Sequence, residues 1–206
     1  MLPKFYPILD VESARRCGYD ALASAGEILE AGAKILQYRY KGFFSREIFA
    51  ELERIHDFCR QSGATFVVND RADIAAMLGA AVHLGQEDLT PSEARRMIGN
   101  AMIGFSTHNQ HQMRQAGSQP ADYVAFGPIF GTSSKQNPDP VVGLDELRRM
   151  CALTTRPLVA IGGITRANAR SVLDAGADSV AVIGDLFAPG ESVRNRAAEW
   201  LALLSN

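Results

Sequence analysis

The stretch TFVVNDRADIAAMLGAAVHLGQEDL, residues 65–89, decides the fold of this chain because it holds two short apolar runs that each lead to a carboxylate. The first run, residues 66–68, leads to Asp70, and the second, residues 81–84, leads to Asp88. Between the runs, apolar side chains recur at helical spacing. The stretch therefore predicts strand, helix, strand. If the strands are parallel neighbours, their C-terminal ends lie side by side and the two carboxylates can face one another.

The rest of the chain repeats this alternation. Strands are predicted over residues 5–9, 33–40, 66–68, 81–84, 102–106, 123–127, 158–161 and 179–183. Helices are predicted over residues 13–31, 45–61, 74–78, 91–98, 109–116, 144–153, 166–175 and 192–204. Eight such units predict an α/β fold, a single (β/α)8 TIM barrel over residues 1–206. An open doubly wound sheet is the alternative, but polar residues follow nearly every strand, which favours one shared mouth.

Composition and charge exclude several classes of protein. The formal net charge of −2 gives no general attraction to nucleic acid or to an anionic membrane, so neither is expected as a partner. Cys17, Cys59 and Cys151 lie far apart without a CxxC pair, which argues against a disulfide framework and a zinc site. No apolar run approaches the ~18 residues that span a bilayer, and the N-terminus lacks the features of a signal peptide. We expect a cytoplasmic protein.

Asp70 and Asp88 have two possible roles. In a barrel, the C-terminal ends of all strands surround one mouth, where the two carboxylates could bind a hard divalent cation such as Mg²⁺. Each could instead be the N-cap of the helix that follows, a position that Asp favours because its side-chain oxygen accepts a backbone N–H. The residues alone leave both roles open.

The run QYRYK, residues 37–41, carries the clearest anion-binding pattern. A period of two places Gln37, Arg39 and Lys41 on one side of the strand. One amide and two cations suit a polyanion such as diphosphate. A solvated basic strand end is the alternative.

Hydroxyls and glycines at later strand ends suit a phosphate. The run GPIFGTSSK, residues 127–135, places hydroxyls beside Lys135, although a flexible polar loop has the same composition. Glycines at two neighbouring strand ends, Gly162-Gly163 and Gly184, let backbone N–H groups approach a phosphate.

Two histidines lie near the predicted mouth. His83 lies within a strand and is predicted to pack in the core or to support another site residue rather than to catalyse. His108 follows a strand and could act as a general acid or base because its ordinary pKa is near neutrality. No Ser-His-Asp or Cys-His arrangement can be argued from this sequence.

Together, the motifs resemble those of the thiamine phosphate synthase family, also called thiamine-phosphate pyrophosphorylase. The matching pieces are QYRYK at 37–41, NDRADIA at 69–75, VHLGQEDL at 82–89, IGFSTH at 103–108, DYVAFGPIFGTSSK at 122–135, VAIGGI at 159–164 and GADSVAVI at 176–183. They follow the family's order and approximate spacing across almost the whole chain. The resemblance implies a transferase that joins 4-amino-2-methyl-5-(diphosphomethyl)pyrimidine to 4-methyl-5-(2-phosphoethyl)thiazole, giving thiamine phosphate and diphosphate by a carbocation-like path.

The resemblance also implies a role for each matched residue. The diphosphate would be bound by Gln37, Arg39, Lys41 and Lys135, and the three cations among them would act in catalysis. Mg²⁺, the implied cofactor, would be bound by Asp70 and Asp88. The pyrimidine would be contacted by Asn69 and Ser106. The thiazole phosphate would be enclosed by Thr132, Ser134, Gly163, Ile183 and Gly184.

Several positions depart from the family pattern. Tyr40 stands where an acidic residue is frequent, Ser133-Ser134-Lys135 replaces a more usual Thr-containing triplet, and Gly184 stands where Ser is common. One alternative is thiazole tautomerase, a related barrel in which His108 would matter as an acid or base. Another is a barrel that binds phosphorylated metabolites without catalysis. The sequence leaves the oligomeric state open, and a homo-oligomer is possible.

Overall fold

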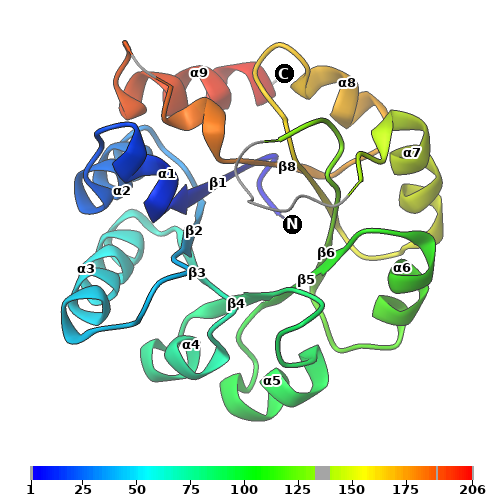
Figure 1. Ribbon diagram of the computed structural model, residues 1–206, viewed down its shortest axis with the longest axis horizontal. Helices are drawn as coiled ribbons and strands as arrows, with labels where there is room; N and C mark the ends of the chain where they lie inside the picture. Colours follow the sequence, from blue (N-terminus) through cyan, green and yellow to red (C-terminus); the bar gives the residue numbers. More distant parts are fainter. Residues whose placement is uncertain (1, 133–139, 189, 206) are drawn as a thin grey trace.

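Eight parallel strands close into a barrel in the computed structural model, which describes residues 2–132, 140–188 and 190–205 (Figure 1). The strands are β1 (Phe5–Asp10), β2 (Ile35–Arg39), β3 (Thr65–Asn69), β4 (Ala81–Leu84), β5 (Ile103–Thr107), β6 (Tyr123–Phe126), β7 (Leu158–Ile161) and β8 (Ser179–Val182). Each strand pairs with its neighbours in sequence, and β8 pairs with β1. The predicted TIM barrel is confirmed, and the open doubly wound sheet is wrong.

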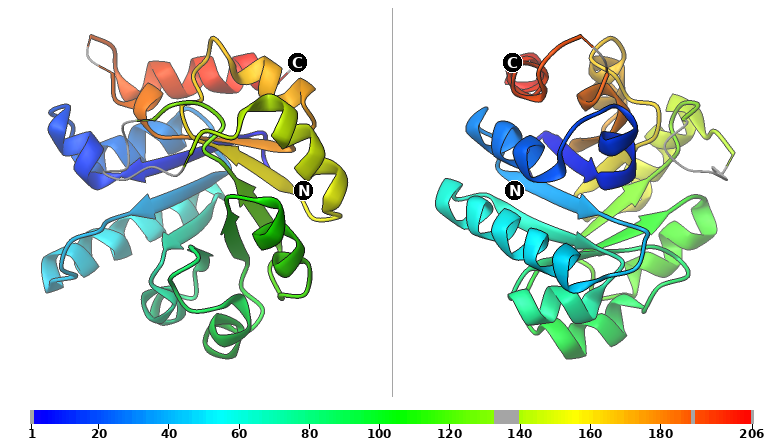
Figure 2. Two further views of the ribbon diagram at one scale, coloured as in Figure 1. Left: turned by 45° about the vertical axis from the view of Figure 1, so that its right-hand side comes forward. Right: turned by 60° about the vertical axis from the view of Figure 1, so that its left-hand side comes forward.

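Helices surround the barrel on its outside (Figures 1 and 2). They are α1 (Val11–Arg16), α2 (Ala21–Glu30), α3 (Arg46–Ser62), α4 (Ala72–Leu78), α5 (Pro91–Ile98), α6 (Gln110–Gly117), α7 (Gly143–Leu153), α8 (Ala169–Asp174), the short 3-10 helix η1 (Gly184–Leu186) and α9 (Val193–Leu204). In the described parts of the chain, none of these helices is long and apolar enough to cross a membrane.

Local sequence sets several helix ends. The Ser45 side chain accepts the N–H of Ile48 and caps the start of α3, and α3 stops at Gly63, whose φ of 66° is left-handed. Thr90 and Glu93 form a reciprocal capping box at the start of α5. These residues fix where α3 begins and ends and where α5 begins.

The single helix predicted over residues 13–31 is wrong. The structure has two helices there, α1 and α2. Gly18 leaves the helical conformation with a φ of 80°, and Asp20 then caps α2 by accepting the N–H of Ala23 at 2.8 Å. The helix predicted from residue 166 also begins later, at Ala169.

Side chains of the barrel divide into two layers. An outer layer packs between the strands and the helices, and it includes Tyr38, whose hydroxyl donates to Glu51 at 2.6 Å. Tyr40 packs against the same layer, so both tyrosines of QYRYK face the helices. The interior layer is smaller and contains Tyr6 and Tyr123. The barrel interior is therefore partly polar, directly beneath the mouth.

Candidate active site

A cavity of about 840 Å³ opens at the C-terminal ends of the strands and receives side chains from all eight of them. It brings together the predicted site residues that the structure describes, which are Gln37, Arg39, Lys41, Asn69, Asp70, Asp88, Ser106, Thr132, Gly163, Ile183 and Gly184. Ser134 and Lys135 lie outside the described residues. Residues distant in sequence thus share one site, as the barrel predicts.

Asp70 and Asp88 face one another across this mouth, and neither is a helix N-cap. Arg71 occupies the N-cap position of α4 without a side-chain cap, and Thr90 caps α5, so the capping alternative is wrong. Asp88 instead accepts the N–H of Gly85 at 2.7 Å. Burial raises the pKa of the Asp88 carboxyl; the Gly85 N–H opposes this rise, while the charge and hydrogen bonding of Asp70 add to it.

The backbone of Asp70 is held in an uncommon conformation. Its φ of 65° makes it a non-glycine residue in the left-handed region. Its N–H donates to the carbonyl of His83 at 2.8 Å, and its carboxylate pairs with Lys41. Such strain persists where surrounding bonds hold it, and it is frequent at functional sites.

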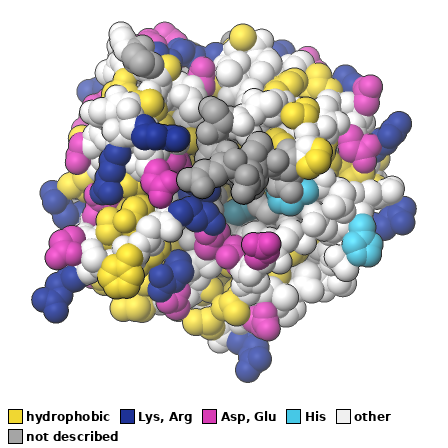
Figure 3. Space-filling model, in the orientation of Figure 1, with side chains coloured by type: hydrophobic (Ala, Val, Ile, Leu, Met, Phe, Trp, Pro, Cys, Tyr) yellow, Lys and Arg dark blue, Asp and Glu magenta, His cyan; other side chains and the backbone are white. Residues whose placement is uncertain are grey.

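The basic residues of β2 reach the mouth already paired with carboxylates. Arg39 pairs with Asp10, which is buried at the end of β1 and also accepts the N–H of Ser13 at 2.8 Å. Lys41 pairs with Asp70. Acidic and basic side chains accordingly lie side by side near the centre of the face in Figure 3. The alternative of a merely solvated basic strand end does not fit these contacts.

The two aspartates fit a magnesium site that shares its ion with a phosphate. In residues 2–132, 140–188 and 190–205, no group of three or more His, Cys, Asp or Glu side chains could hold a metal. Mg²⁺ commonly takes one or two carboxylates and completes its shell with water and substrate phosphates. Two facing carboxylates, one with a raised pKa, form a donor set whose repulsion a cation would relieve.

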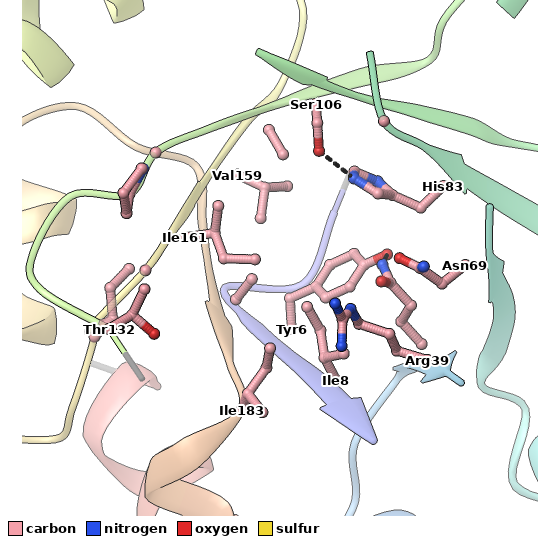
Figure 4. Close-up of a pocket in the computed structure, with 18 of the residues that line it drawn as sticks. Tyr6, Ile8, Arg39, Asn69, His83, Ser106, Thr132, Val159, Ile161 and Ile183 are labelled. Carbon is pink, nitrogen blue, oxygen red and sulfur yellow. Dashed lines mark hydrogen bonds between the residues drawn. The ribbon is translucent and has the colours of Figure 1, made fainter. Parts of the chain in front are cut away.

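Polar side chains line the inner wall below the mouth (Figure 4). His83 bonds Tyr123 through Nδ1 and Ser106 through Nε2, each at 2.9 Å. The packed, supporting position predicted for His83 is confirmed. Asn69 is 7% exposed, and its Nδ2 has no hydrogen-bond partner among the residues described. A buried amide without a partner in the cavity wall marks a place where a ligand can accept a hydrogen bond.

The opposite wall is apolar and meets a glycine loop. Ile161 and Ile183 point into the cavity from the ends of β7 and β8 (Figure 4). Gly163, just beyond β7, has a φ of 63°, and a Cβ there would lie 2.4 Å from the carbonyl oxygen of Gly131. Glycine therefore lets the loops after β6 and β7 pack directly against each other.

His108 lies at the rim of the same cavity. Its Nδ1 is 2.7 Å from the carbonyl oxygen of Gly127, so Nδ1 carries the proton of that bond. Its backbone N–H donates to the side chain of Gln112 at 2.7 Å. The acid or base role of His108 stays a prediction.

Known proteins resemble this chain in sequence and in fold. A profile of the thiamine monophosphate synthase family matches residues 5–186. The chain belongs to the thiamine monophosphate synthase family. The assignment makes it an enzyme, a transferase of thiamine biosynthesis, and it confirms the resemblance seen in the motifs.

Among other members of the thiamine monophosphate synthase family, the thiamine-phosphate synthase of Koribacter versatilis is 47% identical over 98% of this chain and 96% of that protein. The thiamine-phosphate synthase of Chloroflexus aurantiacus is 38% identical over 98% and 93%. A solved structure of thiamine phosphate pyrophosphorylase from Pyrococcus furiosus superposes with a TM-score of 0.86 at 34% identity, covering 98% of this chain and 95% of that one.

In this thiamine monophosphate synthase family member, sequence reasoning missed three residues around the cavity. Asp10, the partner of Arg39, was visible only as a strand-end carboxylate. Tyr6 and Tyr123 were assigned to strands without a role. The signal was available, because a tyrosine on the inner face of a barrel strand needs a partner for its hydroxyl.

Proposed function

We propose that this chain couples 4-amino-2-methyl-5-(diphosphomethyl)pyrimidine to 4-methyl-5-(2-phosphoethyl)thiazole in a Mg²⁺-dependent reaction that gives thiamine phosphate and diphosphate. The observation that carries the proposal is the facing pair Asp70 and Asp88, set beside Lys41 and Arg39 at one barrel mouth. A site for a diphosphate bound together with Mg²⁺ needs carboxylates to hold the metal and cationic side chains to hold the diphosphate.

The cavity offers a separate wall to each part of the substrates. Arg39 and Lys41, with Gln37 and Lys135, would bind the diphosphate, and Asp70 and Asp88 would hold Mg²⁺ beside it. Asn69, whose Nδ2 has no hydrogen-bond partner among the described residues, would bind the pyrimidine ring together with Ser106. The thiazole phosphate would lie among Thr132, Ser134, Gly163, Ile183 and Gly184.

The chemistry needs charge stabilisation rather than a protein nucleophile. The bond between the pyrimidine methylene and the diphosphate oxygen breaks, and the electron pair leaves with the diphosphate. Bound Mg²⁺ would supply positive charge to that leaving group. Arg39 and Lys41 stabilise the same developing negative charge. The aminopyrimidine ring delocalises the positive charge left on the methylene, and the thiazole nitrogen then forms the new C–N bond.

Other residues of the cavity are consistent with a reaction that uses no protein nucleophile or base. Ile161 and Ile183 present hydrocarbon to the cavity, which excludes water from a cationic carbon. None of the three cysteines is among the described residues that line the cavity. No group needs to accept a proton during the coupling, so an active-site base is not required.

The same pocket favours the synthase over thiazole tautomerase. Isomerisation of a thiazole phosphate needs neither a diphosphate site nor a metal site. Here Arg39, Lys41, Asp70 and Asp88 line one cavity with the glycine loops. A barrel retained only for binding is disfavoured because the chain belongs to an enzyme family.

The test is to mix purified protein with both phosphorylated heterocycles, with Mg²⁺ and after removal of divalent ions by a chelator. We expect thiamine phosphate and diphosphate in equal amounts, only when Mg²⁺ is present. Absence of product under all conditions would overturn the synthase proposal. Full activity after chelation would overturn the metal part alone.

A further inference from the structure

We infer that a chain of hydrogen bonds inside the barrel fixes the tautomer of His83 and thereby makes the Ser106 hydroxyl a hydrogen-bond donor to the cavity. The interior relay consists of Gln37, Tyr6, Tyr123, His83 and Ser106. The inference rests on the proposed function, in which Ser106 contacts the pyrimidine. Tyr123 and His83 are then positioning residues, since they act through Ser106.

The interior relay is continuous. Gln37 Nε2 donates to the Tyr6 hydroxyl at 3.0 Å, and the hydroxyls of Tyr6 and Tyr123 are 2.6 Å apart. The Tyr123 hydroxyl lies 2.9 Å from His83 Nδ1, and His83 Nε2 lies 2.9 Å from Ser106 Oγ. Five strands contribute one residue each, so the relay crosses the barrel interior. Figure 4 shows its last bond, between His83 and Ser106.

The direction of every bond follows from the first. An amide nitrogen only donates, so the Tyr6 oxygen accepts from Gln37. The proton of a buried hydroxyl needs an acceptor, and within the described residues Tyr123 is the one other partner of Tyr6. Tyr6 therefore donates to Tyr123.

The same step repeats at Tyr123 and His83. Because Tyr123 accepts from Tyr6, its own proton goes to His83 Nδ1. The neutral imidazole then carries its proton on Nε2 and donates to Ser106 Oγ. With its oxygen accepting from His83, Ser106 has its own proton left to point at a ligand.

Burial preserves the hydrogen bonds of the relay and keeps its two phenols protonated. Tyr6 and Tyr123 are each 1% exposed, and Gln37 is 2% exposed, so water does not compete for these bonds. Burial also raises the pKa of Tyr6 to about 12 and that of Tyr123 well above its ordinary value. Both phenols therefore keep their protons at neutral pH.

A glycine makes the central contact possible. His83 pairs with Gly104 on β5, and Gly104 pairs with Tyr123 on β6, so the three residues are in register. A Cβ on Gly104 would lie 2.1 Å from Tyr123 Cζ and 2.4 Å from His83 Nδ1. The rings of Tyr123 and His83 stack across this gap with centroids 5.6 Å apart.

The relay also defines which ligand the wall recognises. Ser106 presents a hydroxyl donor, and the buried Asn69 amide is a second donor without a partner in the described chain. Two donors suit a heteroaromatic ring whose nitrogens have lone pairs, such as a pyrimidine. A ring analogue with carbon in place of such a nitrogen would leave a donor unsatisfied and bind less well.

The test compares Tyr123→Phe with Tyr6→Phe, which removes the same atom from a neighbouring ring. The His83 tautomer is read from ¹⁵N NMR of the ligand-free protein at pH ~8.5, above the ordinary pKa of histidine. We expect wild type to carry the proton on Nε2. We expect the same of Tyr6→Phe, because without the Tyr6 hydroxyl the buried Tyr123 hydroxyl has His83 Nδ1 as its one remaining acceptor among the described residues. In Tyr123→Phe the bond that selects this tautomer is lost, and we expect the tautomer protonated on Nδ1 to become measurably populated.

Kinetics supply the functional half of the test. Tyr123→Phe should raise KM for the pyrimidine diphosphate roughly tenfold, the effect of one hydrogen bond, with little change in KM for the thiazole phosphate. Added to Ser106→Ala, the same change should raise KM no further, because both act through one hydroxyl.

Two results would overturn the relay. One is a wild-type His83 that carries its proton on Nδ1. The spectrum of the wild-type protein alone gives this result, so it does not depend on whether the variants fold. The other is a double variant whose effects simply add. The NMR spectrum needs no turnover, so a correct tautomer in a protein that forms no thiamine phosphate would refute the proposed function and leave the relay intact.

Discussion

Replacing Asp88 by asparagine should stabilise the metal-free protein while abolishing most of its activity. The carboxylate faces Asp70 and is partly buried, which raises its pKa. Asparagine keeps an oxygen that can accept the Gly85 N–H and removes only the negative charge. The change therefore separates two effects of the Asp88 charge: its repulsion of Asp70 in the metal-free protein, and its contribution to binding a cation.

The magnitude follows from how exposed the pair is. Because solvent screens a half-buried pair, we expect a gain of about 0.5–1 kcal/mol in the free energy of unfolding at neutral pH. For a chain of this length, that gain raises Tm by about 1–4 °C. Loss of a charged metal ligand should lower kcat/KM by ~100-fold or more.

The sign of the pH dependence is fixed by the raised pKa of Asp88. In wild type, the folded carboxyl takes up a proton at higher pH than the unfolded one, so repulsion is relieved as the pH falls. The excess stability of Asp88→Asn should be largest above the raised folded pKa. It should vanish below the ordinary Asp pKa of about 4.

Thermal unfolding with and without Mg²⁺ provides the assay, and Asp73→Asn is the matched control. Asp73 lies three residues after Asp70 but pairs with Arg71 on the surface. We expect Mg²⁺ with diphosphate to stabilise wild type and Asp73→Asn, and to have little effect on Asp88→Asn. A metal-free Asp88→Asn protein that is less stable than wild type, yet still stabilised by Mg²⁺, would refute the reasoning.

Three further changes probe other parts of the site. Arg39→Lys keeps the charge but loses the planar fork, and should raise KM for the pyrimidine diphosphate about tenfold in steady-state assays; an unchanged KM would place the diphosphate elsewhere. Asp10→Asn leaves Arg39 without its buried partner and should lower the unfolding free energy in urea by about 2–3 kcal/mol; no loss would show that the pair contributes little. Gly163→Ala would set a Cβ 2.4 Å from the Gly131 oxygen, and should raise KM for the thiazole phosphate at least ~10-fold; equal effects on both substrates would contradict a local role.

The fold was predictable because the barrel repeats one local pattern. Residues 65–89 show alternating apolar runs whose length suits short buried strands, and each turn carries its own signal, such as Gly63 after α3. The meeting of strand-end residues in one cavity followed from the same reasoning, since a barrel gathers the C-terminal ends of its strands. Individual roles, such as those of Asn69 and Ser106, came instead from the family resemblance. Gln37, Arg39 and Lys41 share one side because a strand has a period of two.

Partners across the barrel could not be predicted in the same way. The two-residue period of a strand predicts that Arg39 faces the mouth. It does not predict that Asp10, 29 positions earlier, is the counter-ion of Arg39. The N-cap role of Asp70 and Asp88 could be excluded only with coordinates, because an N-cap and a metal ligand need the same side chain at the same strand end. The break at Gly18 was missed because alanine-rich spacing continues across it.

The ion pairs at the mouth differ in a way that bears on substrate binding. Asp10 is buried and its second oxygen is occupied by Ser13, so Arg39 is held in place whether or not a ligand is present. Lys41 is 48% exposed and its bond to Asp70 lies at the surface, so this pair can exchange. Under the proposed function, a metal that took the Asp70 carboxylate would release the Lys41 ammonium toward the diphosphate, and a diphosphate that bound Lys41 first would release Asp70 for the metal. Each ligand would then remove a competitor of the other, so we expect the affinity for Mg²⁺ to rise when diphosphate is present, and the affinity for diphosphate to rise when Mg²⁺ is present.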